Sequence, residues 1–252
     1  LYFPDPLLIS NVLTAWGGTA AALNGYLYFG STNIWAPGSL VLSNATLGIP
    51  DSCRWQVAGD LTVITGGVAV EAKAVLACGG DLRLTNGALL RVYGGATNGL
   101  ATTYGALVDI DGALVVASNC WVYPLAHSTD GGSPCFMLGS LAVLAGGGID
   151  ADGRGYYSGC GPGKGGASYG GAGYGGKGGD DYTAAGAGSV YCVTNAPADP
   201  GSGGGNGGGR GGGLVRIEAD GGPVLIDGTI SANAGTTSSL KGGGAGGAIH
   251  IR

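Results

Sequence analysis

The sequence has little charge and no long apolar run. Charged residues make up 11% of the 252 residues, against about 25% in an average soluble domain. The eleven Lys and Arg residues are scattered and the formal net charge is -5, so the basic footprint of a nucleic-acid-binding protein is missing. Gly, Asn or Asp interrupts every apolar stretch before it reaches the length of about 20 residues that a transmembrane helix needs. We therefore expect no nucleic-acid partner and no membrane span.

Residue types that build catalytic and metal sites are also scarce. The chain has two histidines, His127 and His250, no CxxC pair and no nucleophile-elbow sequence. Zinc binding and a hydrolase triad are therefore not indicated. The one adjacent acidic pair, Asp180 and Asp181, lies in a glycine-rich stretch, which is typical of a solvated loop. We expect no catalytic residues and no cofactor.

Six cysteines are present, an even number without a CxxC pair or a histidine at metal-ligand spacing, which favours disulfide bridges over a zinc site. Such bridges imply an oxidising, extracytoplasmic compartment. The sequence does not fix the pairing, and six buried reduced thiols are the alternative. The chain begins at Leu1 without a basic and apolar leader, so an export signal would already have been removed. We expect an extracellular or cell-surface location and local bridges, namely Cys53 with Cys78, Cys120 with Cys135, and Cys160 with Cys192.

The most informative pattern is a repeated phrase of glycine followed by alternating apolar residues. It reads GSLVL, GDLTV and GDLRL from Gly38, Gly59 and Gly80, at intervals of 21 residues. A fixed period of this length is typical of a solenoid. After longer intervals the phrase returns at Gly112, Gly139, Gly212 and Gly221.

Each repeat offers short strands separated by Gly, Asn or Asp turns, without a sustained helical period. A single coil cannot bury its side chains, but stacked coils bury them against one another while their backbones pair as parallel strands. We therefore predict an all-β fold, a right-handed parallel β-helix; an antiparallel sandwich or jelly roll is the alternative. The predicted inward positions are Leu40, Leu42, Leu61, Val63, Leu82, Leu84, Leu114 and Val116.

Half of the 58 glycines lie between Gly146 and Gly213, among several tyrosines. A flexible linker is the alternative, but linkers are usually poor in aromatic residues and cysteines. We predict an insertion of packed, extended segments of the polyglycine-II type, in which backbones approach closely because side chains are missing. A further run, Gly242 to Gly247, is expected to join them.

The phrases GYGGKGG, GSGGGNGGGRGGGLVRIEADGG, IDGTISANAG and KGGGAGGAIHIR resemble the glycine-rich β-helix modules of large bacterial surface and secreted proteins. The resemblance covers roughly residues 146–252, while 38–145 matches only the general style of such coils. It implies an extracellular repeat protein and brings no catalytic residues with it.

These patterns divide the chain into an N-terminal arm with the first coils (1–37), β-helix coils (38–145), the glycine-rich segment (146–213), and C-terminal coils with a further glycine run (214–252). Two DxDG phrases offer weak candidates for calcium ligands, although turn formation explains the same residues. The candidates are Asp109, Asp111, Asp150 and Asp152.

We expect an extracellular structural protein that assembles with itself, head to tail, as a filament, surface-layer or adhesive subunit. Solenoids need polar caps to stay monomeric, and the sequence shows none, so an uncovered coil at each end favours open-ended stacking. A fragment of a longer solenoid would present the same bare ends. The apolar N-terminal residues expected to take part are Leu1, Tyr2, Phe3, Leu7, Leu8 and Ile9.

The alternative function is a carbohydrate-binding or polysaccharide-degrading β-helix protein, with extracellular polysaccharide as its partner. Aromatic side chains would then serve as platforms for sugar rings, provided that they are exposed and aligned. The candidate platforms are Trp16, Trp35, Trp55 and Trp121.

Overall fold

The computed structural model describes residues 38–96, 105–166, 169–182, 186–192, 197–205, 207–237 and 241–252, with the backbone of β1 (Tyr2–Phe3) and β2 (Tyr26–Phe29). In these ranges every named element is a β-strand, and the pairings between strands are parallel. The predicted all-β class and parallel solenoid are therefore confirmed. The other residues of the apolar N-terminal arm, and Trp16 and Trp35, lie outside the described residues.

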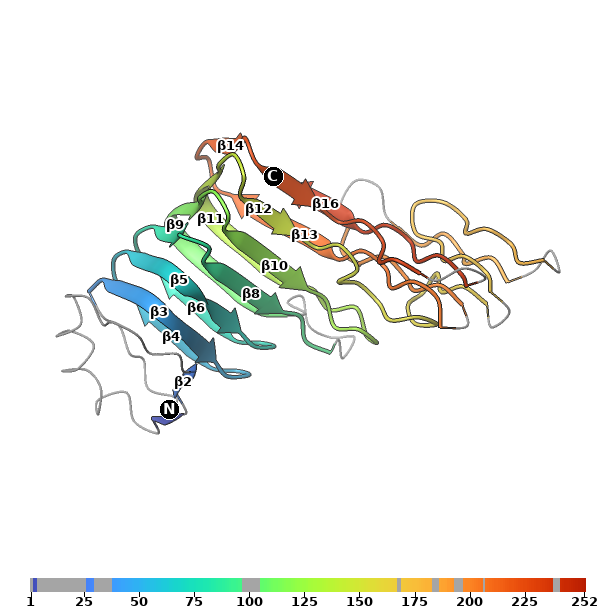
Figure 1. Ribbon diagram of the computed structural model, residues 1–252, viewed down its shortest axis with the longest axis horizontal. Coiled ribbons are helices and arrows are strands. Elements are labelled where there is room, and N and C mark those ends of the chain that lie inside the picture. Colours follow the sequence, from blue (N-terminus) through green and yellow to red (C-terminus); the bar gives the residue numbers. More distant parts are fainter. Residues whose placement is uncertain are drawn as a thin grey trace.

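Each coil of the solenoid runs through three faces, which we call faces A, B and C. Figure 1 shows the coils stacked side by side, from β3 in blue to β16 in red. Face A is formed by the first parts of β3 (Leu40–Ile49) and β5 (Leu61–Val70), β7 (Leu82–Thr85), the last parts of β9 (Leu107–Val116) and β11 (Cys135–Val143), and β14 (Val224–Ile226).

Faces B and C are built in the same way, by strands that lie in register in successive coils. Face B contains the last parts of β3 and β5, then β8 (Leu89–Tyr93), β10 (Trp121–Leu125), β12 (Gly148–Asp150) and β15 (Thr229–Ser231). Face C contains β4 (Arg54–Val57), β6 (Val75–Cys78), the first parts of β9 and β11, β13 (Leu214–Ala219) and β16 (Ala248–Ile251).

The core is the shared interior of the stacked coils. Leu40 pairs with Leu61, and Leu61 pairs with Leu82, each in parallel register. Equivalent apolar side chains therefore contact one another along the solenoid axis, which removes their surface from water. All eight predicted inward positions are buried, with at most 4% of their surface exposed.

The corner between faces C and A explains the repeated glycine phrase. A Cβ at Gly59 would overlap the carbonyl oxygen of Gly38, and the later corner glycines are crowded by the coil before them in the same way. The residue that follows the glycine links the coils, because Asp60 Oδ1 accepts a hydrogen bond of 2.8 Å from the N–H of Asp81. Near the C-terminus the corner position is Gly222, which packs on Gly139, whereas the phrase at Gly212 leads into β13 on face C.

Asp60 therefore provides a first test of the coil-to-coil links. Replacing Asp60 with alanine leaves the Asp81 N–H without its side-chain acceptor, and we expect the free energy of unfolding to fall by about 1 kcal/mol. Asp60→Asn keeps an acceptor oxygen and should lose less. Chemical denaturation of the two variants measures the difference; equal losses would mean that the carboxylate charge, and not the hydrogen bond, stabilises the corner.

The corner between faces A and B repeatedly carries asparagine, a residue type that suits the backbone conformation there. Asn44, Asn86 and Asn119 have φ angles of 53°, 53° and 62°, in the left-handed region that asparagine tolerates better than most residues. Asn44 begins the Asn-Ala-Thr sequence that reads as a glycosylation acceptor. Its place in this stack of corners is a structural reason for the asparagine.

In the part of the chain that the structure describes, the long insertions leave the solenoid at the corner between faces B and C, after β8, β10, β12 and β15. They also bond to one another in that order. Gly94 N–H donates to the Leu125 carbonyl, Ala126 N–H donates to the Arg154 carbonyl, and Gly153 N–H donates to the Asn233 carbonyl. The inserted segments consequently stack as a layer that projects beyond one edge of the coils (Figure 1).

Backbone hydrogen bonds join the glycine runs of this layer, which we call the glycine layer (the described residues of 151–213 and 232–247). The N–H of Gly212 donates to Ala245, while its carbonyl accepts from Gly201; Gly171 likewise donates to Gly179 and accepts from Gly188. A single run thus bonds to two different neighbours. The described residues of the segment between β12 and β13 form no strand.

The predicted disulfide bridges are not present, because all six cysteines are free. Cys78 lies beside Val57 in the pairing of β6 with β4, so it is displaced by four residues, about 13 Å of strand, from Cys53. Bridged cysteines need Cα atoms within about 7 Å. Burial raises the pKa of the Cys78 and Cys135 thiols, which disfavours the reactive thiolate. The other expected pairs, Cys120 with Cys135 and Cys160 with Cys192, are free as well.

Candidate functional site

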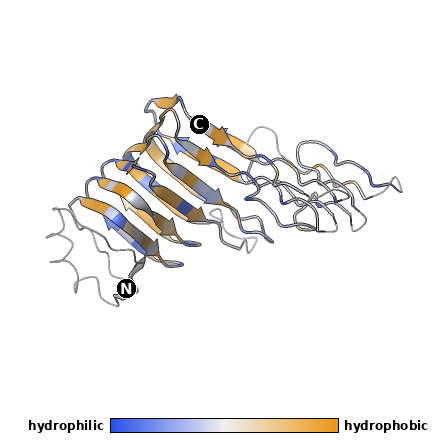
Figure 2. Cartoon of the chain, viewed as in Figure 1, coloured by the Kyte–Doolittle hydropathy of each residue, from blue (hydrophilic) through white to orange (hydrophobic). Residues whose placement is uncertain are grey.

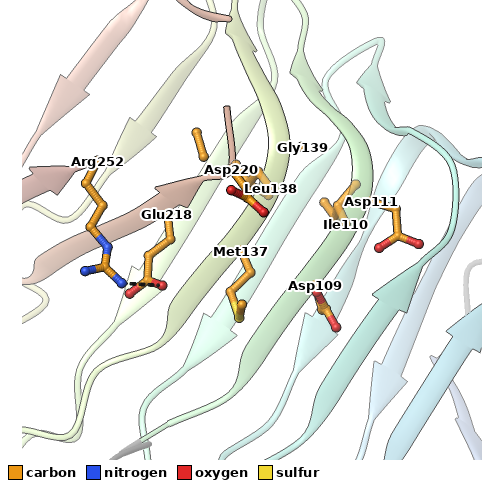
Figure 3. A pocket seen from close by; sticks show the side chains of 10 residues that line it. Asp109, Ile110, Asp111, Met137, Leu138, Gly139, Glu218, Asp220 and Arg252 are labelled. Carbon is orange, nitrogen blue, oxygen red and sulfur yellow. Dashed lines mark ion pairs between the residues drawn. The ribbon is translucent and has the colours of Figure 1, made fainter. Parts of the chain in front are cut away.

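A groove of about 720 Å³ crosses face C, over β9, β11 and β13. Figure 3 shows its side chains, several of which carry carboxylates. Its lining consists of Asp109, Ile110, Asp111, Met137, Leu138, Gly139, Glu218, Ala219, Asp220 and Arg252.

The parallel register brings the groove residues together from distant parts of the sequence. Met137 on β11 pairs with Asp109 on β9 on one side and with Glu218 on β13 on the other. Because adjacent strands lie about 4.8 Å apart, the backbones at Asp109 and Glu218 are separated by about 10 Å. Met137 lies between them and is 44% exposed, so it forms an apolar step between two carboxylates (Figure 3).

Two arginines hold Glu218 in its ionised form. Arg216 Nη2 lies 2.8 Å from Glu218 Oε1, and Arg252 Nη2 lies 3.0 Å from Glu218 Oε2. The hydrogen bonds from Arg216 and Arg252 lower the pKa of the Glu218 carboxyl. A general acid near neutral pH needs the opposite shift, so Glu218 is suited to accept hydrogen bonds and not to supply a proton.

Two of the candidate calcium ligands, Asp109 and Asp111, line this groove. In the described ranges, no three or more His, Cys, Asp or Glu side chains are grouped so that they could hold a metal ion. The arrangement can attract cations and accept hydrogen bonds through its carboxylates.

The other two candidate ligands, Asp150 and Asp152, take part in contacts within and between the insertions. Asp150 forms an ion pair with Arg154 at 2.8 Å. Asp152 accepts hydrogen bonds from the backbone N–H of Asn233 at 2.6 Å and from its side-chain amide at 3.1 Å. Burial opposes ionisation of Asp152, but the bonds from Asn233 outweigh it and lower its pKa. Asp152 therefore joins the segments after β12 and β15, whereas Asp150 holds Arg154 within the first of them.

The remaining residues singled out in the sequence each make contacts of their own. Trp55 is only 2% exposed and belongs to the core, so it is not a platform for sugars. Trp121 is half-buried and its ring packs over Gly148.

His127 pairs with Asp130 at 2.9 Å. His250 lies on β16, and Lys177 pairs with Asp180.

A buried polar network in the glycine layer was not predicted from the sequence. Ser202 is fully buried; its hydroxyl accepts from the N–H of Gly163 at 3.0 Å and donates to the Tyr191 hydroxyl at 2.9 Å. Tyr191 in turn donates to the Pro200 carbonyl at 2.5 Å. Burial raises the pKa of Tyr191 and raises that of Tyr156 to about 12. One serine within a glycine run carries no sequence signal for this role.

Together these features define a parallel β-solenoid with a stacked layer of insertions and an open groove on face C. No protein-family model, curated protein or solved structure matches the chain. Among the described residues there is no helix long and apolar enough to cross a bilayer.

Proposed function

We propose that the protein is an extracellular structural subunit, without catalytic activity, that assembles with copies of itself through the open end of its solenoid. The supporting observation is the state of the last coil, where side chains that point inward are exposed. The same arrangement would serve a filament, a surface layer or an adhesive array.

The last described coil repeats the core positions of the coil before it, but no described strand packs over it. Val224 pairs with Leu141, and Ile226 pairs with Val143. Leu141 and Val143 are 1% and 0% exposed, whereas Val224 and Ile226 are 42% and 44% exposed. Figure 2 shows β14 and β16 in the hydrophobic colour at this end.

At the same end, strands have one edge whose backbone N–H and C=O groups pair with no described strand. Within the described chain, β14, β15 and β16 each pair with a single strand, β11, β12 and β13 respectively. An apolar surface beside unpaired strand edges favours the addition of another parallel coil. We assign that coil to a second copy of this chain. A contact between unlike ends of two copies would propagate without closing and produce a filament.

The handedness of the coil and the packing of the glycine runs are also part of this proposal. A right-handed coil is favoured because parallel crossover connections are almost always right-handed. A polyglycine-II type of packing is supported by Gly212 and Gly171, because the N–H and the carbonyl of each bond to different runs. In a β-strand the N–H and the carbonyl of one residue point to the same neighbouring strand.

The test replaces an inward-facing residue of the open coil with a charged one. Val224→Lys should abolish assembly of the native protein, because a lysine cannot be buried without a partner. Val41→Lys is the matched control, since Val41 is 44% exposed on the first described coil of face A. Electron microscopy and sedimentation velocity measure particle size, and circular dichroism checks folding.

Long particles from the native protein and Val41→Lys, with single particles from Val224→Lys, would support the proposal. The proposal fails if the native protein is monodisperse, or if residues of the native protein itself cover β14 and β16. Surface labelling of intact cells tests the extracellular location separately.

A further inference from the structure

Arginine side chains lie over tyrosine rings where face B meets the glycine layer. Arg91 and Arg154 both lie over the ring of Tyr123, with their Cζ atoms 5.7 Å and 4.3 Å from its centroid. Arg210 lies over the ring of Tyr157 at 4.2 Å. We call these five residues the arginine-tyrosine strip.

The fold makes the strip continuous. Arg91 on β8 pairs directly with Tyr123 on β10, and Figure 1 shows these strands side by side, leading toward the inserted segments. Arg154 follows β12, and its carbonyl accepts from the segment after β10, at Ala126. Arg210 Nη2 lies 3.4 Å from the Gly155 carbonyl, next to Arg154 in the chain.

Two of the three arginines keep their charge available. Asp150 neutralises Arg154 through the ion pair at 2.8 Å. Arg91 and Arg210 form no ion pair within the described residues, and Arg210 Nε is buried without a hydrogen-bond partner. In a chain of net charge -5, two unpaired guanidinium groups on one strip mark a place that favours an anion.

The geometry also selects the kind of anion. A guanidinium has several N–H donors in one plane, and those that make no bond within the protein match a carboxylate or sulfate in bidentate fashion. The Tyr157 side chain, which is 49% exposed, offers apolar surface on which the C–H groups of a sugar can pack. Nucleic acid fits less well, because its binding depends on many phosphate contacts and the strip offers only two arginines without an ion pair among the described residues.

We infer that the arginine-tyrosine strip binds an acidic polysaccharide, a linear glycan that carries uronate carboxylates or sulfate esters. This binding goes beyond the proposed function and does not depend on assembly through β14 and β16. It gives the subunit an extracellular partner recognised by charge and by ring stacking.

The experiment measures binding of the native protein to polygalacturonate, to a sulfated galactan and to neutral dextran by affinity electrophoresis. Arg91→Gln should weaken binding to the acidic polymers about tenfold, the loss expected for one charge-assisted hydrogen bond. Arg210→Gln should act in the same direction. Arg83→Gln is the control, because Arg83 has a side chain that is 46% exposed and is paired with Asp81 on face A.

Binding to either acidic polymer that falls with salt, and that Arg91→Gln weakens while Arg83→Gln does not, supports the inference; the preferred polymer distinguishes carboxylate from sulfate. Equal retention on dextran, equal loss in Arg83→Gln, or tighter binding of single-stranded DNA would overturn it. Sedimentation of the same samples keeps the two proposals separate: a variant that assembles but no longer binds polymer affects only this one.

Discussion

Gly211→Ala should loosen the glycine layer much more than Gly243→Ala, although both positions are glycines within it. A Cβ at Gly211 would overlap the backbone carbonyl of Gly201, whereas a Cβ at Gly243 would meet nothing within 4 Å. Two backbones would have to separate to admit the methyl group added at position 211, and we expect a loss of about 3 kcal/mol. At Gly243 the smaller entropy of unfolded alanine makes the change neutral or stabilising, by at most about 1 kcal/mol.

Hydrogen exchange is the suitable measurement, because it reports on the layer separately from the solenoid. The N–H groups of Gly155 and Gly201, which donate to Gly211 and Gly212, should lose protection in Gly211→Ala and keep it in Gly243→Ala. If both variants retain protection at these amides, the close packing of glycine backbones does not hold the layer together.

The second large effect is expected for Leu82→Ala in the core. Leu82 is fully buried and lies between Leu61 and Leu114 of the neighbouring coils. Removing its side chain leaves a cavity that the stacked coils cannot fill, at a cost of about 2 to 5 kcal/mol. The adjacent outward residue supplies the control, since Arg83→Ala should change stability by less than about 1 kcal/mol.

The distribution of the damage in Leu82→Ala is as informative as its size. Each coil contacts only its neighbours, so the stability of a solenoid is roughly a sum of local terms. We expect amides of β5, β7 and β9 to lose exchange protection, while β12 and β15 keep theirs. A uniform loss over the whole chain would show instead that the coils unfold as one cooperative unit.

The coils were predictable because their signal is local and periodic. The spacing of Gly38, Gly59 and Gly80 reflects a corner where backbones from successive coils nearly touch. Alternating leucines and valines reflect one buried face. These requirements act on each repeat separately, so they leave a pattern in the sequence that a single chain reveals.

The contacts between insertions were not predictable, because they join residues far apart in the chain. Asp152 and Asn233 are 81 residues apart, and Asp109 reaches the same groove as Glu218 only through the register of the strands. The cysteines were misleading for the same reason. Cys53 and Cys78 are close in sequence and lie in neighbouring coils, yet the strand register displaces one along the strand from the other.

The placement of all the long insertions at one corner separates two dimensions of the molecule. A segment that leaves after face B and returns at face C changes nothing in the rise from one coil to the next. Residues gained or lost there alter the breadth of the inserted layer, while the stacked coils keep their total length and their register. Breadth and length can therefore vary independently in a protein of this design.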